Sequence, residues 1–416
     1  MLKILHTADW HLGKRLQEYT RIAEQKLVLD EICQVADQEE VDLVLLAGDI
    51  FDAFNPSHES VELLYKTLRR LSKNGMRPVV AISGNHDSTQ FVEAPDPLAR
   101  ELGILFYSRY DSIISCGTLE GGLEISKSDT GFVELRLPKY DFPIRILLAP
   151  YANEVSLRTY LGEENREEAF RELLAQNWKT LADRYCDDKG VNLFMGHFFF
   201  MEEGSTIPPD AEPESERPIL HVGGTQSLFT QQLPHQIQYA ALGHLHRYQT
   251  VSNAPCPVVY SSSPLAYSFS EADQEKNVVL IHAQPGQPVK YHPIALKQGR
   301  PLYRVSFDNL PDTLNWLENH PYCFVEVTYQ TDESIDAATR KAILKAHDGI
   351  VNLIPQLSHG AGQAREELRA EDLSRDMETL FRLFYTSEKG QEPNAYLVDL
   401  FKEVLSKTTA SWFLFA

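Results

Sequence analysis

The 416-residue chain is poor in cysteine and has no long apolar run. Its five cysteines are scattered, and no two form a CxxC pair, which argues against both a disulfide framework and a zinc ribbon. No stretch approaches the roughly 20 apolar residues of a membrane-spanning helix. The N-terminus turns polar too early for a secretory signal peptide. We therefore expect reduced thiols and a cytoplasmic protein without a membrane partner.

Positive charge is also scarce, since 39 lysines and arginines stand against 59 acidic residues and the formal net charge is -20. This balance argues against a free-standing nucleic-acid binder. It is compatible with a metal-dependent enzyme, because bound divalent cations invert the local field around clustered carboxylates. If DNA is the substrate, local basic patches or a partner must supply much of the affinity. The candidate phosphate contacts, each better explained as a solvated charge, are Lys14, Arg15, Arg69, Arg70, Lys73 and Arg247.

Apolar runs at 2–6, 41–47 and 78–83 alternate with helical patterns at 20–40 and 57–71, which is typical of a layered α/β fold. From 104 to 150 the pattern changes to short alternating segments that predict hairpins continuing or facing the first sheet. A strong amphipathic pattern predicts a helix over 163–185. Further strands are expected at 191–195, 237–242, 257–260 and 277–281, and a surface loop at 202–218.

After residue 300 the pattern resets to strand, helix, strand, helix and strand. We therefore predict a first domain at 1–285, a small α/β capping domain at 300–357, and a linker with C-terminal helices at 358–416. The last segment carries apolar and aromatic residues at helical spacing, and it ends in Trp412-Phe-Leu-Phe415. Such anchors either pack within the chain or enter a groove of a partner, and we favour the partner.

Five predicted strands end in side chains that can bind a metal ion. These residues are Asp9 with His11, Asp49, Asn85 with His86, His197, and His244 with His246. Four of the five ends are preceded by glycine, and ligands in open α/β sheets bind at the carboxyl ends of strands. Any single member is explained as a turn residue, but five such ends together predict a shared site.

Oxygen and imidazole donors without thiolate suit manganese, iron or zinc. These side chains are too many for one tetrahedral ion, but seven of them suffice for two ions that share a bridging carboxylate. Such a pair generates hydroxide at neutral pH and holds both the attacking and the leaving oxygen of a phosphoryl centre.

The motifs D-x-H, GD-x-x-D, GNHD, GH and GHLH, in this order, resemble the calcineurin-like metallophosphoesterase superfamily. Within it, His6-Thr-Ala-Asp-Trp-His-Leu-Gly13 and Ser261-Ser-Ser-Pro-Leu-Ala-Tyr-Ser-Phe-Ser270 are similar to the bacterial nuclease subunits that work with a coiled-coil ATPase. The match covers about residues 1–281, and the remainder matches only in layout. The resemblance implies a two-sheet sandwich flanked by helices, with a small capping domain and a C-terminal helical segment that docks on the ATPase.

The resemblance also implies roles for the candidate residues. One metal ion, most suitably Mn2+, would take Asp9, His11 and His246. The other would take Asn85, His197 and His244, and Asp49 would bridge the two. His86 would act on the scissile phosphate or as the acid for the leaving 3′-oxygen, and Asp52 would orient it by a hydrogen bond. Ala53 stands where phosphoprotein phosphatases carry arginine, which weakens the phosphatase interpretation. Eukaryotic and archaeal nucleases have histidine at the Asp52 position, so their details do not transfer directly.

The function implied is a DNA nuclease that processes double-strand ends and hairpins in repair, recombination and replication. It would act as a 3′–5′ exonuclease and a single-strand endonuclease together with an SMC-like ATPase subunit, and the family expectation is a homodimer. The alternative is a stand-alone phosphoesterase for cyclic nucleotides or other small phosphoesters. A scaffold with an inactive site is a third hypothesis, against which the complete ligand set argues.

Overall fold

The computed structural model describes residues 1–119, 121–152, 157, 166–205, 227–331 and 335–357, and near the carboxyl end 378–382, 385, 393, 397–398 and 400–402. It divides into two compact units: Met1–Arg304 with Tyr322–Glu326, and Val305–Pro321 with Val327–Ala416. Most of the loop predicted at 202–218 and most of the linker and helices predicted at 358–416, including Trp412-Phe-Leu-Phe415, lie outside the described residues. Within the described part, no helix is long and apolar enough to cross a membrane.

The first unit contains a six-stranded mixed sheet. Its order is β18 (Lys290–Ala295), β17 (Asn277–Ala283), β1 (Leu2–Thr7), β4 (Leu43–Ala47), β5 (Val79–Ile82) and β6 (Ile104–Tyr107). The strands β1, β4, β5 and β6 are parallel, whereas β17 and β18 are antiparallel to their neighbours. The carboxyl ends of β1, β4 and β5 therefore meet at one edge.

An eight-stranded sheet forms the second layer. Its order is β15 (Gln249–Ser252), β16 (Val258–Tyr260), β14 (Tyr239–Gly243), β11 (Val191–His197), β10 (Ile144–Ala149), β9 (Phe132–Arg136), β8 (Glu124–Asp129) and β7 (Gly117–Thr118). The strands β10, β11, β14 and β16 are parallel. Two short pairs, β2 (Arg15–Leu16) with β3 (Tyr19–Thr20) and β12 (Phe200–Met201) with β13 (Leu228–Phe229), lie outside the two sheets.

The two sheets pack face to face over a continuous apolar core. Leu45 of β4 and Ile4 of β1 belong to the same fully buried cluster as Ile146 of β10, Leu193 of β11 and Ala241 of β14. Alternate residues along these strands face this core, while their neighbours face the flanking helices. The two-sheet sandwich expected from the family resemblance is therefore confirmed.

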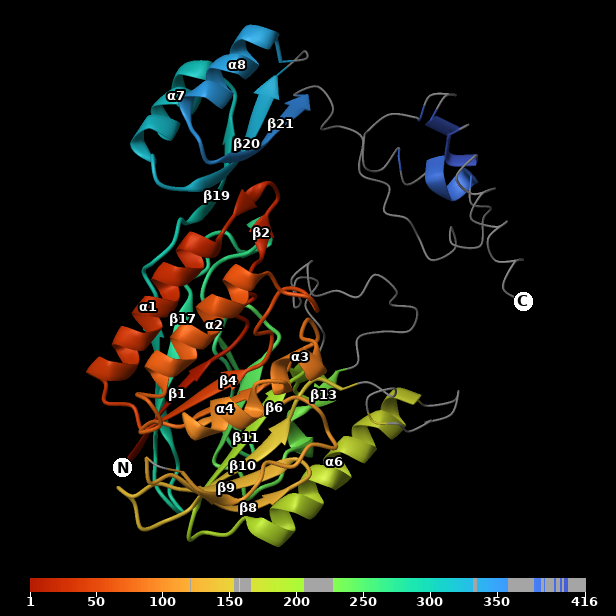
Figure 1. Cartoon of the computed structure of the whole chain (residues 1–416). Coiled ribbons are helices and arrows are strands. Elements are labelled where there is room, and N and C mark those ends of the chain that lie inside the picture. The colour runs from red at the N-terminus through yellow and green to blue at the C-terminus, as the bar shows by residue number, and fades with distance from the viewer. Residues whose placement is uncertain are drawn as a thin grey trace. The chain divides into compact units, whose positions relative to one another are not determined.

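Helices cover the outer faces of both sheets (Figure 1). On the first sheet lie α1 (Ile22–Gln38) and α2 (His58–Leu71), and α6 (Arg166–Tyr185) lies on the second. Helix α2 begins at Ser57, whose side chain accepts a hydrogen bond from the Ser60 amide. Two short helices that were not predicted, α3 (Thr89–Glu93) and α4 (Asp96–Glu101), follow β5.

Strand β18 extends the first unit past the boundary predicted at residue 285. It pairs with β17 along its whole length, from Asn277 opposite Ala295 to His282 opposite Lys290. The sequence there contains Gly286 and Pro293, which are typical of a linker. Because β18 is an edge strand, however, Pro293 can lie in it without breaking a central hydrogen-bond ladder.

The strand–helix–strand–helix–strand pattern predicted after residue 300 is present. It consists of β19 (Leu302–Phe307), α7 (Leu310–Asn319), β20 (Phe324–Thr331), α8 (Ala337–Ala346) and β21 (Ile350–Leu357), and the sheet order is β19-β20-β21. Both helices begin at side-chain caps, Asn309 for α7 and Asp336 for α8. Farther along the second unit, Phe381 stacks on Phe401 with ring centroids 4.2 Å apart.

Candidate metal centre

The candidate ligands lie at or directly after the carboxyl ends of β1, β4, β5, β11 and β14. Four of these residues adopt positive φ although they are not glycine: Asp9 (55°), His11 (44°), Asp49 (48°) and His244 (100°). Hydrogen bonds from Asp9 N to Gly48 O (3.0 Å) and from His11 N to Asp49 O (2.9 Å) hold the first two loops together. Backbone strain of this kind costs about 1–3 kcal/mol per residue and concentrates at functional sites.

The glycines before the ligands are required by close packing between the loops. A Cβ atom on Gly84 would lie 2.1 Å from Asp49 Oδ1, and one on Gly48 would lie 2.2 Å from His197 Nδ1. A Cβ on Gly243 would lie 1.9 Å from the carbonyl oxygen of Ala47, which belongs to the other sheet. The glycines therefore let strand ends from both sheets approach one another at the site.

One group of donor atoms consists of Asp9, His11 and His246, which are buried and lie within 4.8 Å of one another. His11 Nε2 is 3.0 Å from His246 Nε2. Asp9 Oδ1 accepts a hydrogen bond from the His244 amide at 2.8 Å. Its other oxygen, Oδ2, is buried and has no hydrogen-bond partner among the described residues. A buried carboxylate oxygen of this kind needs a cation or a proton.

Asp49 lies between this group and a second one. Its Oδ2 is 3.5 Å from His11 Nε2 and 3.3 Å from His197 Nε2. Its Oδ1 accepts a hydrogen bond from the His86 amide at 3.0 Å. One oxygen is thus fixed by the main chain, and the other faces imidazoles from both groups.

The second group centres on the side-chain oxygen of Asn85. Asn85 Oδ1 is 3.0 Å from His197 Nε2 and 3.1 Å from His244 Nδ1. His197 Nδ1 is 2.8 Å from the carbonyl oxygen of Ala47, so Nδ1 donates to that oxygen and Nε2 is the nitrogen available to a metal ion. The structure therefore brings together all seven predicted metal ligands, four from the first sheet and three from the second.

The spacing and chemistry of these donors suit a divalent cation. Ligand atoms bonded at about 2.1 Å and at right angles lie about 3.0 Å apart, which is close to the separations observed here. Burial raises the pKa of Asp9. Although burial lowers the pKa of His197, the nearby Asp49 and Asp9 raise it to about 9. The pocket thus favours positive charge at its centre, which a metal ion would supply in place of protons.

His86 lies beside the first group, with its ring centroid 4.9 Å from that of His11. His86 Nδ1 is 3.1 Å from the main-chain oxygen of Asp52. The main chain of Asp52 therefore contacts the His86 ring, and a carboxylate oxygen of Asp52 lies within 4.8 Å of a His86 ring nitrogen. The Asp52 carboxylate also accepts a hydrogen bond from Lys14 Nζ at 2.8 Å and lies 3.5 Å from His11 Nδ1.

The environment of Asp52 keeps its carboxylate charged. Burial alone would raise its pKa, but His11 and Lys14 lower it to about 2. Lys14 is itself only 9% exposed. Of the candidate phosphate contacts, Lys14 is thus committed to a buried ion pair, whereas Arg247 is exposed.

Two buried acidic residues at the site were not predicted. Asp87 accepts three main-chain hydrogen bonds, from Ile50 N (3.0 Å), Phe51 N (2.9 Å) and Gly84 N (2.9 Å), and so fixes the loop after β4. Its position in the GNHD motif is the sequence feature that could have identified it. Glu271 Oε1 lies 3.2 Å from His246 Nδ1. It directly follows the serine-rich motif that ends at Ser270.

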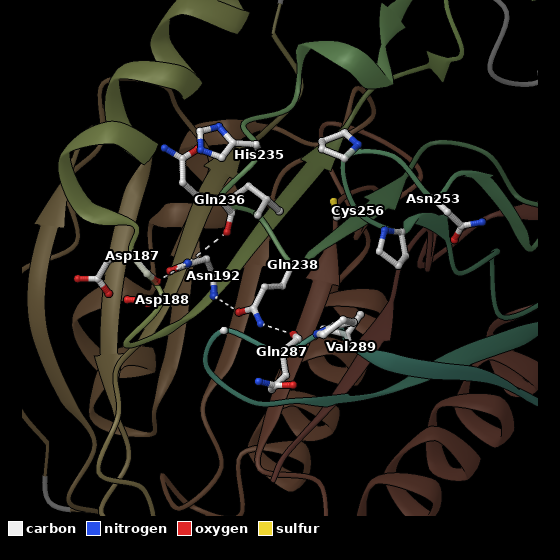
Figure 2. A pocket seen from close by; sticks show the side chains of 15 residues that line it. Asp187, Asp188, Asn192, His235, Gln236, Gln238, Asn253, Cys256, Gln287 and Val289 are labelled. Carbon is white, nitrogen blue, oxygen red and sulfur yellow. Dashed lines mark hydrogen bonds between the residues drawn. The ribbon is translucent and has the colours of Figure 1, made fainter.

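A pocket of about 510 Å³ opens at the opposite, amino ends of β11, β14 and β16 (Figure 2). Asn192 and Gln238 line it. Gln238 Nε2 donates hydrogen bonds to the main-chain oxygens of Gln284 (2.8 Å) and Gln287 (2.6 Å). None of the predicted metal ligands lines this pocket.

Comparison with known proteins supports a metal-dependent phosphoesterase. Residues 2–248 match the calcineurin-like phosphoesterase family. The SbcD subunit of the SbcCD nuclease of Bacillus subtilis (strain 168) is 31% identical over 413 residues, which cover 97% of this chain and 98% of the relative. The SbcD subunit of Rhodobacter capsulatus is 32% identical over 300 residues, covering 70% and 69%. That of Staphylococcus epidermidis is 25% identical over 416 residues, covering 97% and 98%.

These matches confirm the resemblance drawn from the sequence motifs. They also extend beyond residue 281, where only the order of the predicted elements resembled the family. The match to the phosphoesterase family spans all seven candidate ligands. The chain therefore belongs to the calcineurin-like phosphoesterase family, within its group of SbcD nuclease subunits, and is a metal-dependent hydrolase.

Proposed function

We propose that this chain is the nuclease subunit of an SbcCD-type complex and that it hydrolyses DNA phosphodiester bonds with two divalent ions, most suitably Mn2+. The observation that carries the proposal is the position of Asp49 Oδ2, 3.5 Å from His11 Nε2 and 3.3 Å from His197 Nε2. A carboxylate oxygen between two imidazole groups is the arrangement that a bridging ligand requires. Asp9, His11 and His246 would hold one ion, and Asn85, His197 and His244 the other.

When bound, two such ions would supply a hydroxide nucleophile and neutralise charge on the phosphate. The chain itself positions the remaining groups. His86 directs Nδ1 at the Asp52 carbonyl, which can only accept, so Nδ1 donates and the ring is held in one orientation. Its Nε2 is then the atom that can donate a hydrogen bond to the phosphate or a proton to the leaving 3′-oxygen. Asp52 thus acts on His86 as a positioning residue.

The relatives are named as one subunit of a nuclease, which supports a nucleic-acid substrate and a partner subunit. We propose that the chain processes double-strand ends and hairpins, as a 3′–5′ exonuclease and a single-strand endonuclease, in the cytoplasm and in complex with an SbcC-type coiled-coil ATPase. A net charge of -20 leaves the chain dependent on a partner for much of its DNA affinity. We further propose that the helices near the C-terminus bind this ATPase and that two copies of the chain form a homodimer.

A manganese-dependent nuclease assay of the full-length chain, with and without the ATPase, tests the proposal. In wild type we expect cutting of single-stranded DNA with Mn2+ and none with EDTA. In His86→Ala we expect Mn2+ binding to be retained and the cutting rate to fall by about 10²–10⁴-fold, because general acid catalysis is worth that much. Rapid hydrolysis of cyclic nucleotides without any action on DNA would instead identify a stand-alone phosphoesterase.

A further inference from the structure

A buried carboxylate–lysine pair lies directly behind one of the metal-binding histidines. Glu271 Oε1 is 3.2 Å from His246 Nδ1, and Glu271 Oε2 accepts a hydrogen bond from Lys276 Nζ at 2.6 Å. The side chains of Glu271 and Lys276 are only 2% and 8% exposed. Neither residue belongs to the proposed ligand set.

Hydrogen bonds to neighbouring groups hold both side chains of this pair in place. Lys276 Nζ also donates to the main-chain oxygen of His246 (2.8 Å) and to Ser263 Oγ (3.1 Å), so its three donors are matched by three acceptors. Glu271 Oε1 also accepts from Ser268 Oγ at 3.2 Å. Glu271 and Lys276 thus hold His246 by both its ring and its main chain.

This contact determines which nitrogen of His246 can bind a metal ion. Because the carboxylate of Glu271 accepts, Nδ1 of His246 must donate, and the lone pair is on Nε2. Nε2 is the atom that lies 3.0 Å from His11 Nε2 in the first ligand group. A carboxylate behind a ligating imidazole also makes that imidazole a stronger donor.

The two proposed ion sites differ in what lies behind their histidines. In the first site, the Glu271 carboxylate lies 3.2 Å from His246 Nδ1, and the Asp52 carboxylate lies 3.5 Å from His11 Nδ1. In the second, His197 Nδ1 lies 2.8 Å from the neutral carbonyl of Ala47, and the Asp9 carboxylate is farther away, at 3.9 Å. A carboxylate therefore lies closer to the second ring nitrogen of His246 and of His11 in the first site than to that of His197 in the second.

We propose that Glu271, held in place by Lys276, is a positioning residue that makes the ion at Asp9, His11 and His246 the more tightly bound of the two. This inference rests on the proposed two-ion function. It predicts two classes of Mn2+ affinity in one chain and assigns the tighter class to the site that Glu271 supports.

The test is a titration of the metal-free full-length chain with Mn2+, in which electron paramagnetic resonance counts the free ion. Wild type should bind two ions with distinct affinities. Glu271→Gln should weaken the tighter class by about tenfold or more, the usual effect of losing such a carboxylate, and leave the weaker class unchanged. In an Asn85→Ala background, which removes a ligand of the second site, the same substitution should weaken the single remaining class.

Glu134→Gln is the matched control. Glu134 has a side chain only 1% exposed and accepts hydrogen bonds from Arg145 (2.9 Å) and Lys127 (3.3 Å), but it lies on β9, outside the strand ends that carry the proposed ligands. Its loss should reduce stability and leave both Mn2+ affinities as in wild type. If circular dichroism shows that Glu271→Gln does not fold, Glu271→Asp takes its place. The shorter side chain keeps the charge but withdraws from His246, so the tighter class should again weaken.

Equal weakening of both classes, no weakening, or the same effect from Glu134→Gln would overturn the inference while the two-ion function stands. A wild-type chain that binds fewer than two Mn2+ ions would overturn the proposed function itself, and the inference with it. The stoichiometry of wild type therefore separates the two failures.

Discussion

At the residue scale, the metal centre depends on main-chain conformations that side chains normally disfavour. Asp9, His11 and Asp49 all adopt positive φ, and Gly84 has no room for a side chain. The main-chain amides of Ile50 and Phe51 donate to Asp87, which holds the loop after β4 against the start of GNHD. The ligands are thus placed by their loops before any ion binds, which lowers the cost of binding one.

Gly84→Ala should abolish Mn2+ binding although it adds only a methyl group. The new Cβ would lie 2.1 Å from Asp49 Oδ1 and 2.4 Å from Asp49 N, so the proposed bridging residue must move. Isothermal titration with Mn2+ measures the effect. The control is Gly117→Ala, where a side chain is strained by the positive φ of 157° but its Cβ would meet no atom within 4 Å. This variant should lose some stability and still bind Mn2+ as wild type does. Undiminished binding in Gly84→Ala would contradict the geometry described here.

Sequence alone was enough to propose every ligand, because each lies at the end of a buried strand or a few residues after it. It did not reveal Glu271 or Asp87 as functional. Glu271 reaches His246, 25 positions earlier in the chain, only because the loop between β16 and β17 folds back over the site. It also did not reveal that Asp52 contacts His86 by its main chain, since residue type cannot distinguish a carbonyl contact from a carboxylate contact.

At the scale of single elements, helix α6 is anchored by aromatic packing on the outer face of the second sheet. The ring of Trp178 lies 4.8 Å from Phe194 and 6.1 Å from Phe200, measured between centroids. The amphipathic pattern predicted this helix and its buried stripe. The short pairs β2–β3 and β12–β13 were not predicted, because two-residue strands leave no periodic signal.

Trp178→Ala should destabilise the chain by about 3–5 kcal/mol, since it removes a large, fully packed side chain and leaves a cavity. Urea unfolding followed by circular dichroism measures the loss. Lys179→Ala changes the neighbouring, exposed residue of the same helix and should alter the free energy of unfolding by less than about 0.5 kcal/mol. Similar losses in both variants would mean that helix formation, not packing of Trp178, determines the contribution of α6.

At the scale of the whole first unit, the two sheets are held together at both ends of their strands. At the amino ends, the Asp42 carboxylate accepts hydrogen bonds from Lys3 N (2.9 Å), Lys139 Nζ (2.7 Å) and Tyr140 OH (2.7 Å). Lys3 belongs to the first sheet, and Lys139 and Tyr140 lie just before β10 of the second. At the carboxyl ends, the candidate ligands of the two sheets face one another.

Asp42→Asn should lower stability by about 1.5–3 kcal/mol at pH 7, the usual worth of hydrogen bonds to a charged group. Burial alone would raise the pKa of Asp42, but Lys139 and Tyr140 lower it below its ordinary value. The stabilisation is therefore present above the unfolded-state pKa of about 3.9 and is lost as pH falls through the lower folded-state pKa. Urea unfolding at pH 7 and at about pH 2.5 should show the difference between variant and wild type shrinking in acid. Exposed Asp188→Asn should show no such difference at either pH.

Removal of metal should lower the stability of the first unit, because the candidate ligands lie at the carboxyl ends of its strands. Ions bound only by the folded chain stabilise it by about 2.7 kcal/mol when their concentration is a hundred times the dissociation constant. Calorimetry should therefore show a lower unfolding temperature in EDTA and its recovery with Mn2+. In Asp49→Asn, which removes the proposed bridging charge, the difference between the two conditions should largely disappear.

Because each of the two candidate ligand groups draws residues from both sheets, the geometry of the metal centre depends on the separation of two whole layers. No single loop controls it. A force that moved one layer away from the other would pull apart the ligands of both groups at once. We therefore expect metal binding to weaken under tension across the sandwich, which would not be expected of a centre built on one sheet.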